Sequence, residues 1–278
     1  MKIARIATIL FTSVSVVAHA APPSFERDIV VVDFDDKSAE VLKRPWNRAY
    51  AADVTERLLA AKARAVVIKI FMDTPSADEA IDARLEQVMK GGRVILQASI
   101  SSEPPVSSDL QERFRFRGPV TGVKPNLTAK AGWLPIARFQ AAAARVCFAD
   151  ALDVTIAPVI EELNGRLYKS LNTCILEEAI GSELASIGPA TAKIGPWRLP
   201  VNADAGVPVR LVRTPLPSRI SAQDVLLATG PITGIEGRIA ILTYSEAKSP
   251  TRIIEGEAMK IHDAFLAVLR GFYETLRP

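Results

Sequence analysis

The sequence has little of the chemistry on which most hydrolases and metal proteins rely. Its 278 residues include two histidines and two cysteines, too few for a metal site built on a His/Cys cluster. It contains neither a Gly-x-Ser-x-Gly elbow nor a His-Glu-x-x-His pair. Beyond the first twenty residues there is no apolar run of the ~20 residues that a bilayer-spanning helix needs. These absences exclude a His/Cys metal site and argue against the hydrolases that use the two missing motifs.

The first twenty residues resemble a cleaved secretory signal. Lys2 and Arg5 form a basic start, Ile6–Val17 is mostly apolar, and Ala18-His19-Ala20 has the small-x-small pattern of a cleavage site. The apolar stretch is too short to be a bilayer anchor. The sequence therefore predicts cleavage after Ala20 and a periplasmic or secreted mature chain without a transmembrane segment.

Loss of this segment leaves a nearly neutral protein. Removing Lys2 and Arg5 leaves 32 basic residues against 31 acidic ones. That balance lacks the basic surface that nucleic-acid binding requires. It also leaves His262 as the last histidine, at the start of an amphipathic segment where a surface or packing role is the simplest interpretation.

Short apolar runs alternating with amphipathic segments indicate the fold class. The runs are Ile29–Val32, Ala65–Ile70, Arg93–Ala98 and Arg238–Tyr244. A helix carrying Val54, Leu58, Leu59 and Ala61 separates the first two, and Ala77–Lys90 separates the second and third. Two strands that are joined by a helix and lack polar alternation are typical of parallel strands buried on both faces. We expect an α/β fold with a layered, mostly parallel central sheet flanked by helices, in which the first two runs form a parallel pair.

The middle and end of the chain predict further elements within a single domain over residues 21–278. Asn164-Gly165 favours an antiparallel hairpin in the middle segment. Residues 100–130 are rich in proline and serine and predict a long surface segment. The other expected elements are strands Val154–Ile160, Arg166–Tyr168 and Arg145–Phe148, short strands within 191–215, and helices Leu134–Ala144, Leu171–Ile180, Ser221-capped 222–227 and Glu257–Arg270.

Two cysteines remain in the mature chain. Export permits a disulfide between Cys147 and Cys174, and two free thiols in the core are the alternative. In the chain-entropy model, a bridge would stabilise the fold by roughly 3–4 kcal/mol, because it closes a loop in the unfolded chain.

Charged and aromatic side chains gather where the first two strands end. Alternation puts Asp33 and Asp35 on one face of the first strand, and Lys69 ends the second. In open α/β sheets ligands bind at this edge. We therefore expect a ligand site for a small anion or polar solute here, with the proline-rich segment 100–130 as the alternative binding surface. The predicted residues of the ligand site are Asp33, Asp35, Asp36, Trp46, Arg48 and Lys69.

The alternative is a partly buried salt-bridge network of Asp33, Asp35, Arg48 and Lys69, with Trp46 closing the sheet end. A Ca²⁺ or Mg²⁺ site at the aspartates has little support, because no Asp-x-Asp-x-Asp-Gly loop is present. No metal and no cofactor is predicted.

Several segments, in order, resemble the CHASE2 domain, an extracytoplasmic sensory module of bacterial cyclases and kinases. They are VVVDFDDKS, the RPWNR turn, LLAAKARAVVIKIFM, SADEAIDARLEQVMKGGRVIL, GRLYKSLNTCILEEA, RLPVN, RISAQDVL, IEGRIAIL and IHDAFLAVLRGF. The chain departs from the family pattern at Lys69, where an aspartate is usual, and at Tyr168-Lys169, where Tyr-Pro is usual.

The resemblance implies a sensory domain that works by binding and is not an enzyme. Family members usually continue into transmembrane helices and an output domain, and this sequence stops soon after the closing helix. We therefore expect a diverged stand-alone copy whose partner is a small ligand or an envelope signalling protein. Two alternatives stay open: a periplasmic small-solute-binding protein, and a hydrolase using Asp33 or Asp35 with Asp73 or Asp78.

Overall fold

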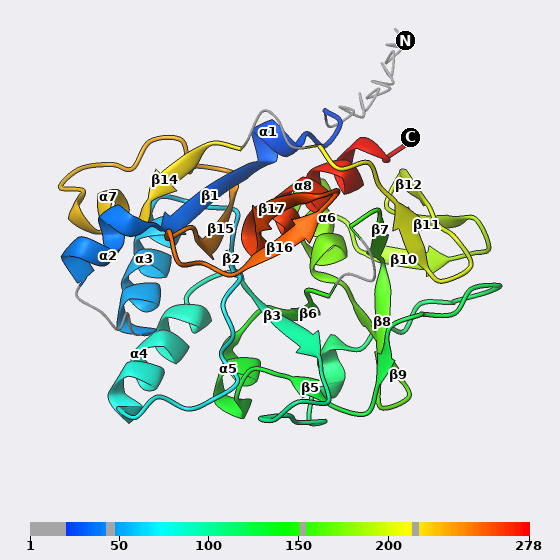
Figure 1. The fold of residues 1–278 in the computed structure, drawn as a ribbon, viewed down its shortest axis with the longest axis horizontal. Helices are drawn as coiled ribbons and strands as arrows, with labels where there is room; N and C mark the ends of the chain where they lie inside the picture. The colour runs from blue at the N-terminus through cyan, green and yellow to red at the C-terminus, as the bar shows by residue number, and fades with distance from the viewer. Residues whose placement is uncertain (1–20, 43–47, 151–153, 213–216) are drawn as a thin grey trace, which may run out of the picture.

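The computed structural model describes residues 21–42, 48–150, 154–212 and 217–278. The predicted signal segment and Trp46 lie outside these residues. The chain folds around a mostly parallel sheet with helices on both faces (Figure 1). In spatial order the strands are β14 (Arg219–Ser221), β1 (Ile29–Phe34), β15 (Ile239–Tyr244), β2 (Ala65–Ile68), β3 (Val94–Ile100) and β6 (Arg145–Phe148), and β5 (Gly132–Trp133) pairs antiparallel with the end of β3. The predicted α/β class and parallel sheet are confirmed.

Alternate residues of the central strands face two separate cores. Val30 and Val32 of β1 pack toward one group of helices, whereas Ile29 and Val31 pack toward the other. The first group is α3 (Arg48–Ala60), α4 (Glu79–Lys90), α5 (Ala137–Ala142) and α7 (Ala222–Leu227). The second is α6 (Leu171–Ile180), α8 (Ile261–Glu274) and the short α1 (Phe25–Asp28). Because both faces are covered, each central strand is continuously apolar, as the sequence shows.

The strand order corrects one prediction. β1 and β2 are parallel but do not pair, because β15 lies between them, with Ile239 opposite both Ile29 and Ala65. The late strand Ile239–Leu242 is buried on both faces, which suits it to the centre of the sheet. Hydrophobic periodicity marks a strand as buried but does not say which strand is its neighbour.

The predicted hairpin exists, but its first arm lies later in the sequence. Asn164 and Gly165 have φ of 51° and 74°, as a two-residue hairpin loop requires. This loop joins β8 (Ile160–Leu163) to β9 (Arg166–Lys169), and β4 (Thr128–Ala129) adds a parallel strand. The expected arm Val154–Ile160 is wrong: β7 (Ile156–Pro158) pairs with β13 (Gly206–Pro208) instead. The true strand was missed because it contains the acidic pair Glu161-Glu162.

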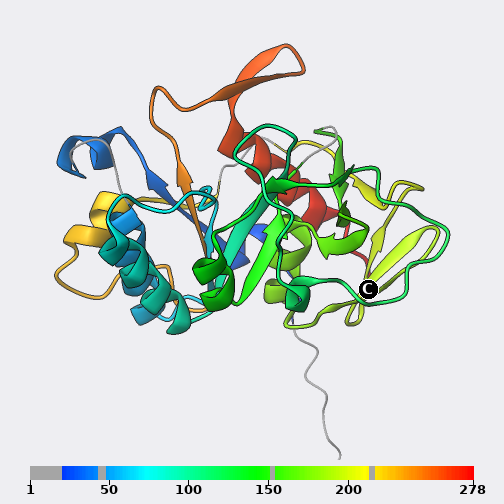
Figure 2. The same ribbon diagram turned by 90° about the horizontal axis from the view of Figure 1, so that it is seen from below.

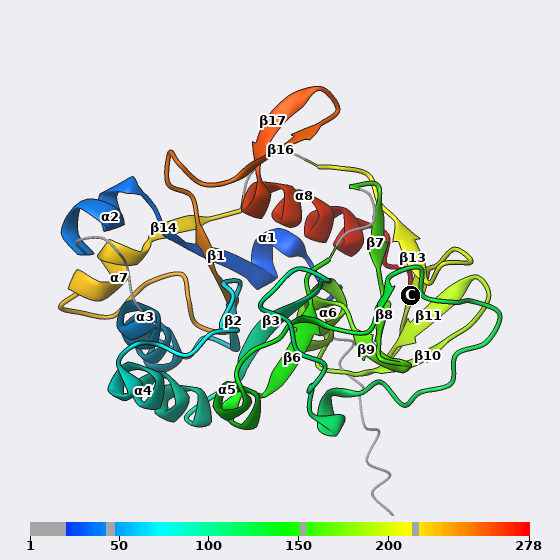
Figure 3. The same ribbon diagram turned by 60° about the horizontal axis from the view of Figure 1, so that its bottom comes forward.

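Two predicted helices are shorter or shifted. The helix expected over Leu134–Ala144 is Ala137–Ala142, because Pro135 disfavours helical geometry at the preceding residue and Ala143 is already extended. In the expected helix Glu257–Arg270, the first four residues form a strand. β17 (Glu257–Lys260) pairs with β16 (Thr251–Ile254), and α8 begins at Ile261. Figures 2 and 3 show this hairpin standing out from the body beside the start of α8.

The remaining segments complete the periphery. The surface segment 100–130 contains the 3₁₀ turn Glu112–Phe114 and is anchored by buried Leu110 and Phe116. The short strands expected within 191–215 are present. They include β11 (Thr191–Ile194) and β12 (Trp197–Pro200), which form one antiparallel sheet with β10 (Leu184–Ile187). The helix α2 (Asp36–Leu42) follows β1.

Candidate ligand site

A cavity lies at the carboxyl ends of the central strands. Its volume is about 600 Å³, within the range of roughly 300–1,000 Å³ typical of small-molecule sites. Parallel strands all end at the same edge, so β2, β3, β6 and β15 bring their last residues together there, and the first turns of α8 form the opposite wall. The lining residues are Lys69, Ile70, Phe71, Gln97, Ser99, Trp133, Ala149, Asp150, Val154, Asn172, Tyr244, Pro250, Arg252, Ile261, His262, Ala264, Phe265 and Val268.

The walls of this cavity are mainly apolar and aromatic. Phe71 and Trp133 meet edge to face with ring centroids 5.2 Å apart. The indole N–H of Trp133 donates to the carbonyl of Glu103 at 2.9 Å, which fixes the ring. Phe265 enters from α8. Flat apolar walls of this kind favour a ligand with an apolar body.

Lys69 is the cation of the cavity. It directly follows the last residue of β2, and it is only 6% exposed. The ammonium nitrogen lies 3.5 Å from Oε1 of Gln97, at the limit of a hydrogen bond, and 4.5 Å from the ring centroid of Phe265. Burial lowers the pKa of Lys69 to about 8, and the charge of Asp150 opposes that shift.

Asp150 supplies the carboxylate of the cavity. It accepts hydrogen bonds from the hydroxyl of Ser99 at 2.6 Å and the backbone N–H of Ile100 at 2.9 Å. Burial nevertheless raises its pKa. Behind it, Glu161 is fully buried, and both burial and the charge of Asp150 raise the pKa of Glu161 well above its usual value. The pair therefore favours a neutral Glu161 beside a hydrogen-bonded Asp150.

Two further buried polar side chains line the cavity. Oδ1 of Asn172 and Nδ1 of His262 have no hydrogen-bond partner among the described residues, although the two residues are 4% and 9% exposed. Burial, together with the charges of Lys69 and Arg219, lowers the pKa of His262 to about 3. The imidazole is therefore neutral at physiological pH. Unpartnered buried groups are costly, so their presence in a cavity is informative.

The predicted residues Asp33 and Asp35 lie beside the cavity, not in its lining. Asp33 is buried and accepts from Nη1 of Arg219 at 2.6 Å and from the hydroxyl of Thr243. Arg219 also bonds Asp263, at the start of α8. Asp33 thus joins β1 to β14, β15 and α8.

Asp35 and Asp36 fix the turn after β1. Asp35 caps α2, accepting from the backbone N–H of Ser38 at 2.8 Å and from the hydroxyls of Ser38 and Ser221. Burial acts to raise the pKa of Asp35, but these hydrogen bonds outweigh it, so the pKa lies below its ordinary value. Ser221 precedes α7 but makes no side-chain cap there, contrary to prediction, because its hydroxyl serves Asp35. The exposed Asp36 accepts from the backbone of Ala247 at 3.0 Å.

Arg48 belongs to the helical layer. It donates to Asp82 at 2.8 Å and to the carbonyl of Thr74, and its guanidinium stacks over Phe139 at 5.3 Å. It therefore joins α3 to α4 and α5. Arg48 therefore does not cover the predicted site. It also does not join Asp33 and Lys69 in the alternative salt-bridge network. Among the described residues that the sequence predicted, Lys69 alone lines the cavity.

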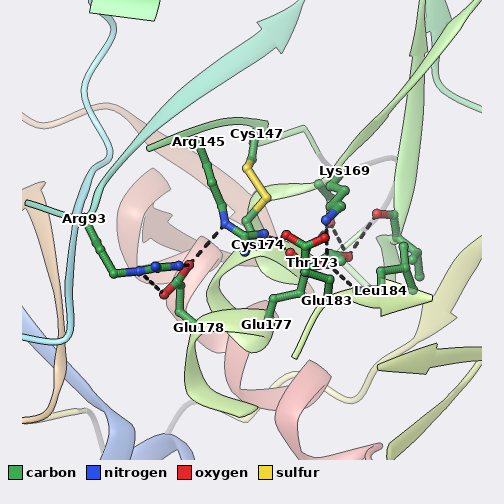
Figure 4. The surroundings of a disulfide bond; sticks show 12 residues. Arg93, Arg145, Cys147, Lys169, Thr173, Cys174, Glu177, Glu178, Glu183 and Leu184 are labelled. Atoms are coloured by element: carbon green, nitrogen blue, oxygen red, sulfur yellow. Dashed lines mark hydrogen bonds and ion pairs between the residues drawn. A yellow bond between two sulfur atoms is a disulfide. The ribbon is translucent and has the colours of Figure 1, made fainter. Parts of the chain in front are cut away.

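The two cysteines are bonded to each other, which answers the question that the sequence left open. The Cys147–Cys174 disulfide joins β6 to α6. Figure 4 shows Arg93, Arg145 and Lys169 reaching toward carboxylates of α6 around the bond. Glu177 pairs with Arg145 and with Lys169, the latter at 2.7 Å, and Glu178 pairs with Arg93 at 2.6 Å. This region is an extensively paired network that holds α6 against the sheet.

Sequence reasoning missed Gln97, Asp150 and Asn172 and assigned His262 a surface or packing role. Gln97 had a signal, since it is the polar residue inside the apolar run Val94–Ala98. Asp150 lies two residues after the strand Arg145–Phe148, at the same edge as Lys69, so the rule that selected Lys69 applies to it as well. Asn172 and His262 had none, because only the packing of α6 and α8 brings them to this edge.

The sheet and its two helical layers define an α/β fold with a cavity at the strand ends. A family model described as the CHASE2 domain matches residues 8–253, so the chain belongs to the CHASE2 family, a family of extracytoplasmic sensory domains. No curated protein and no solved structure matches the chain. The match ends before α8, and the likeness of that helix to the family stays a prediction.

No group of three or more His, Cys, Asp or Glu side chains among the described residues is placed to hold a metal ion. None of the helices in that part of the chain combines the length and apolarity needed to cross a membrane.

Proposed function

We propose that this chain is an extracytoplasmic ligand-sensing domain, one unit over residues 21–278, whose ligand binds in the cavity at the carboxyl ends of β2, β3, β6 and β15. The proposal includes cleavage after Ala20 and a periplasmic or secreted mature protein. Membership of the CHASE2 family supports the sensory role. The role requires binding of a small molecule and no turnover.

One observation carries the assignment of the site. Lys69, Asn172 and His262 are buried polar side chains that line one cavity with apolar walls. Among the described residues, Oδ1 of Asn172 and Nδ1 of His262 have no hydrogen-bond partner, and Lys69 has only the 3.5 Å approach to Gln97. Buried polar groups are normally partnered, by protein or by water. A bound small molecule with a few polar groups would supply those partners and fill the apolar space.

Binding at this position would reach several elements at once. The cavity touches strand ends of the central sheet, the first turns of α8 and the β16–β17 hairpin through Arg252. A ligand that favours one arrangement of α8 and this hairpin would shift the populations of the arrangements by its difference in affinity. That coupling would carry the signal to an envelope partner.

Thermal unfolding with a matched pair of variants tests the proposal. A panel of small organic molecules with apolar bodies is screened for those that raise the unfolding midpoint, since a ligand of the folded state stabilises it. Ala264→Trp places an indole in the cavity, and Ala60→Trp adds the same group to an exposed position of α3. We expect hits to stabilise the wild type and Ala60→Trp but not Ala264→Trp. A panel without hits, or hits that persist in Ala264→Trp, would contradict the assignment.

A further inference from the structure

The chemistry of the cavity restricts the kind of ligand, and this inference rests on the proposed function. The first observation concerns the donors of Lys69. An ammonium carries three N–H donors. Among the described residues its polar contact is the single 3.5 Å approach to Gln97, and it forms no ion pair there. Asp150 acts on it through charge, with no hydrogen bond or ion pair between these two described side chains. Lys69 therefore retains donors for an acceptor in the cavity.

The second observation concerns the balance of charge. Arg252 lines the rim from β16, is exposed, and has no ion pair within the part of the chain that the structure describes. Among the described residues, the cavity thus carries Lys69 and Arg252 against Asp150, and His262 is neutral. An anion entering past Arg252 toward Lys69 meets two cations. A cation would meet the same two cations, with Asp150 as its carboxylate partner among the described lining residues.

The third observation concerns the space around Lys69. Phe265 lies under the ammonium, and Phe71, Trp133, Ile70 and Val268 form the walls beyond it. A free inorganic anion would leave most of a 600 Å³ apolar cavity unfilled. An acid with a flat apolar body matches both the ammonium and the walls.

From these three observations we propose that the cavity binds a small organic acid with an aromatic or similarly flat apolar body, whose anionic group meets the ammonium of Lys69. The anion completes the hydrogen bonding of Lys69 in place of water. The apolar body lies between Phe265 and the Phe71–Trp133 pair. Arg252 contributes long-range attraction at the rim.

Three probes that share one body and differ in charge test the ligand class. They are 1-naphthaleneacetate, its neutral amide 1-naphthaleneacetamide, and the cation 2-(1-naphthyl)ethylamine, each titrated calorimetrically at pH 7. We expect the acid to bind about tenfold more tightly than the amide, the effect of one charge-assisted hydrogen bond, and the amine to bind most weakly. In Lys69→Met the acid should lose its advantage while the affinity for the amide is retained. Lys62→Met, at a surface lysine that is 75% exposed, is the matched control and should bind like the wild type.

A second measurement applies if Lys69→Met does not fold. The affinity of the wild type for the acid should fall between pH 7 and pH 9 as Lys69 loses its proton, while the affinity for the amide stays constant. The charged or titratable groups facing Lys69 are Asp150, His262, Tyr244 and Arg252, with Glu161 behind Asp150. The amide titration corrects for changes in any of them that alter the cavity itself.

The outcomes separate the two proposals. Equal binding of acid and amide, or a preference for the amine, would overturn the acid class and leave the cavity as a ligand site. Binding of none of the three probes would count against the cavity as a ligand site, and hence against the proposed function as well. An acid preference that survives in Lys69→Met would remove Lys69 from the recognition of the ligand.

Discussion

The polar cluster at the end of β1 and the cavity at the ends of β2 and β3 occupy the same edge of one sheet. Each contains a buried charged residue, Asp33 in the first and Lys69 in the second. At β1, Asp33 has Arg219 and Thr243 as partners, and Asp35 has Ser38 and Ser221. Within the described part of the chain, Lys69 has one polar contact, at 3.5 Å, and Asn172 and His262 each have an atom without a hydrogen-bond partner.

This difference separates a structural cluster from a candidate site. A buried charge with full hydrogen bonding is held by the fold and helps to hold it in turn, so its loss harms stability. A buried polar group without partners weakens the fold, and its removal is tolerated or favourable. The predictions below compare the two clusters by the sign and size of the effect on stability.

The largest effect is expected at Asp33. Asp33→Asn keeps the shape but removes the charge that Arg219 faces, and breaking a buried ion pair costs about 3 kcal/mol of unfolding free energy, measured by urea denaturation at pH 7. The matched control is Asp224→Asn, where the carboxylate is 54% exposed and pairs with exposed Lys37. Its loss should change stability by about 0.5 kcal/mol or less. If Asp33→Asn stays fully stable yet loses ligand affinity, Asp33 belongs to the site, as the sequence predicted.

An intermediate effect is expected at His262 in acid. Its pKa in the fold, about 3, lies below the ordinary 6.5, so protonation is disfavoured in the folded state. The stability that this group contributes is complete above pH 6.5 and is lost as the pH falls toward 3. Between pH 7 and pH 5 the wild type should lose about 2 kcal/mol more than His262→Gln, measured by urea denaturation at each pH. Parallel curves for the two proteins would show that the imidazole is solvated.

The smallest effect, and the one of opposite sign, is expected at Lys69. Its pKa in the fold, about 8, lies below the ordinary 10.5, so the charge weakens the fold below pH 8 and the penalty disappears as the pH rises to 10.5. Lys69→Met should be more stable than the wild type by about 1 kcal/mol at pH 7, after allowance for the lost contact with Phe265. The gap should narrow above pH 8. A destabilised Lys69→Met at pH 7 would place Lys69 with the fully partnered charges.

Much of the fold could be predicted because burial on both faces leaves a direct mark on the sequence. The runs at Ile29, Ala65, Val94 and Ile239 are strands for that reason, and the Asn164-Gly165 turn needs only local geometry. The position of β15 could not be predicted in this way, since periodicity carries no information on neighbours. The first arm of the hairpin was missed because Glu161 is a buried acid, the rare exception to polar residues being exposed.

The candidate site was predicted as a location more than as a set of residues. The rule that ligands bind at the carboxyl edge led to Lys69. The same rule selected Asp33 and Asp35, whose roles depend on Arg219 and Ser221, each 186 residues away in the chain. Partners at that separation leave no local pattern. Whether a polar side chain at the edge is free to meet a ligand is therefore a property of the tertiary structure.

The place of β15 has a consequence for how this chain reaches its native state. During synthesis β1 emerges first, but its central neighbour, residues 239–244, is among the last segments to appear. Until then the edges of β1 and β2 that β15 will join are left open. Such long-range pairing slows folding and leaves unpaired strand edges exposed. A polypeptide that cannot complete its sheet early stays unfolded for longer, which would suit the export that we propose for this chain.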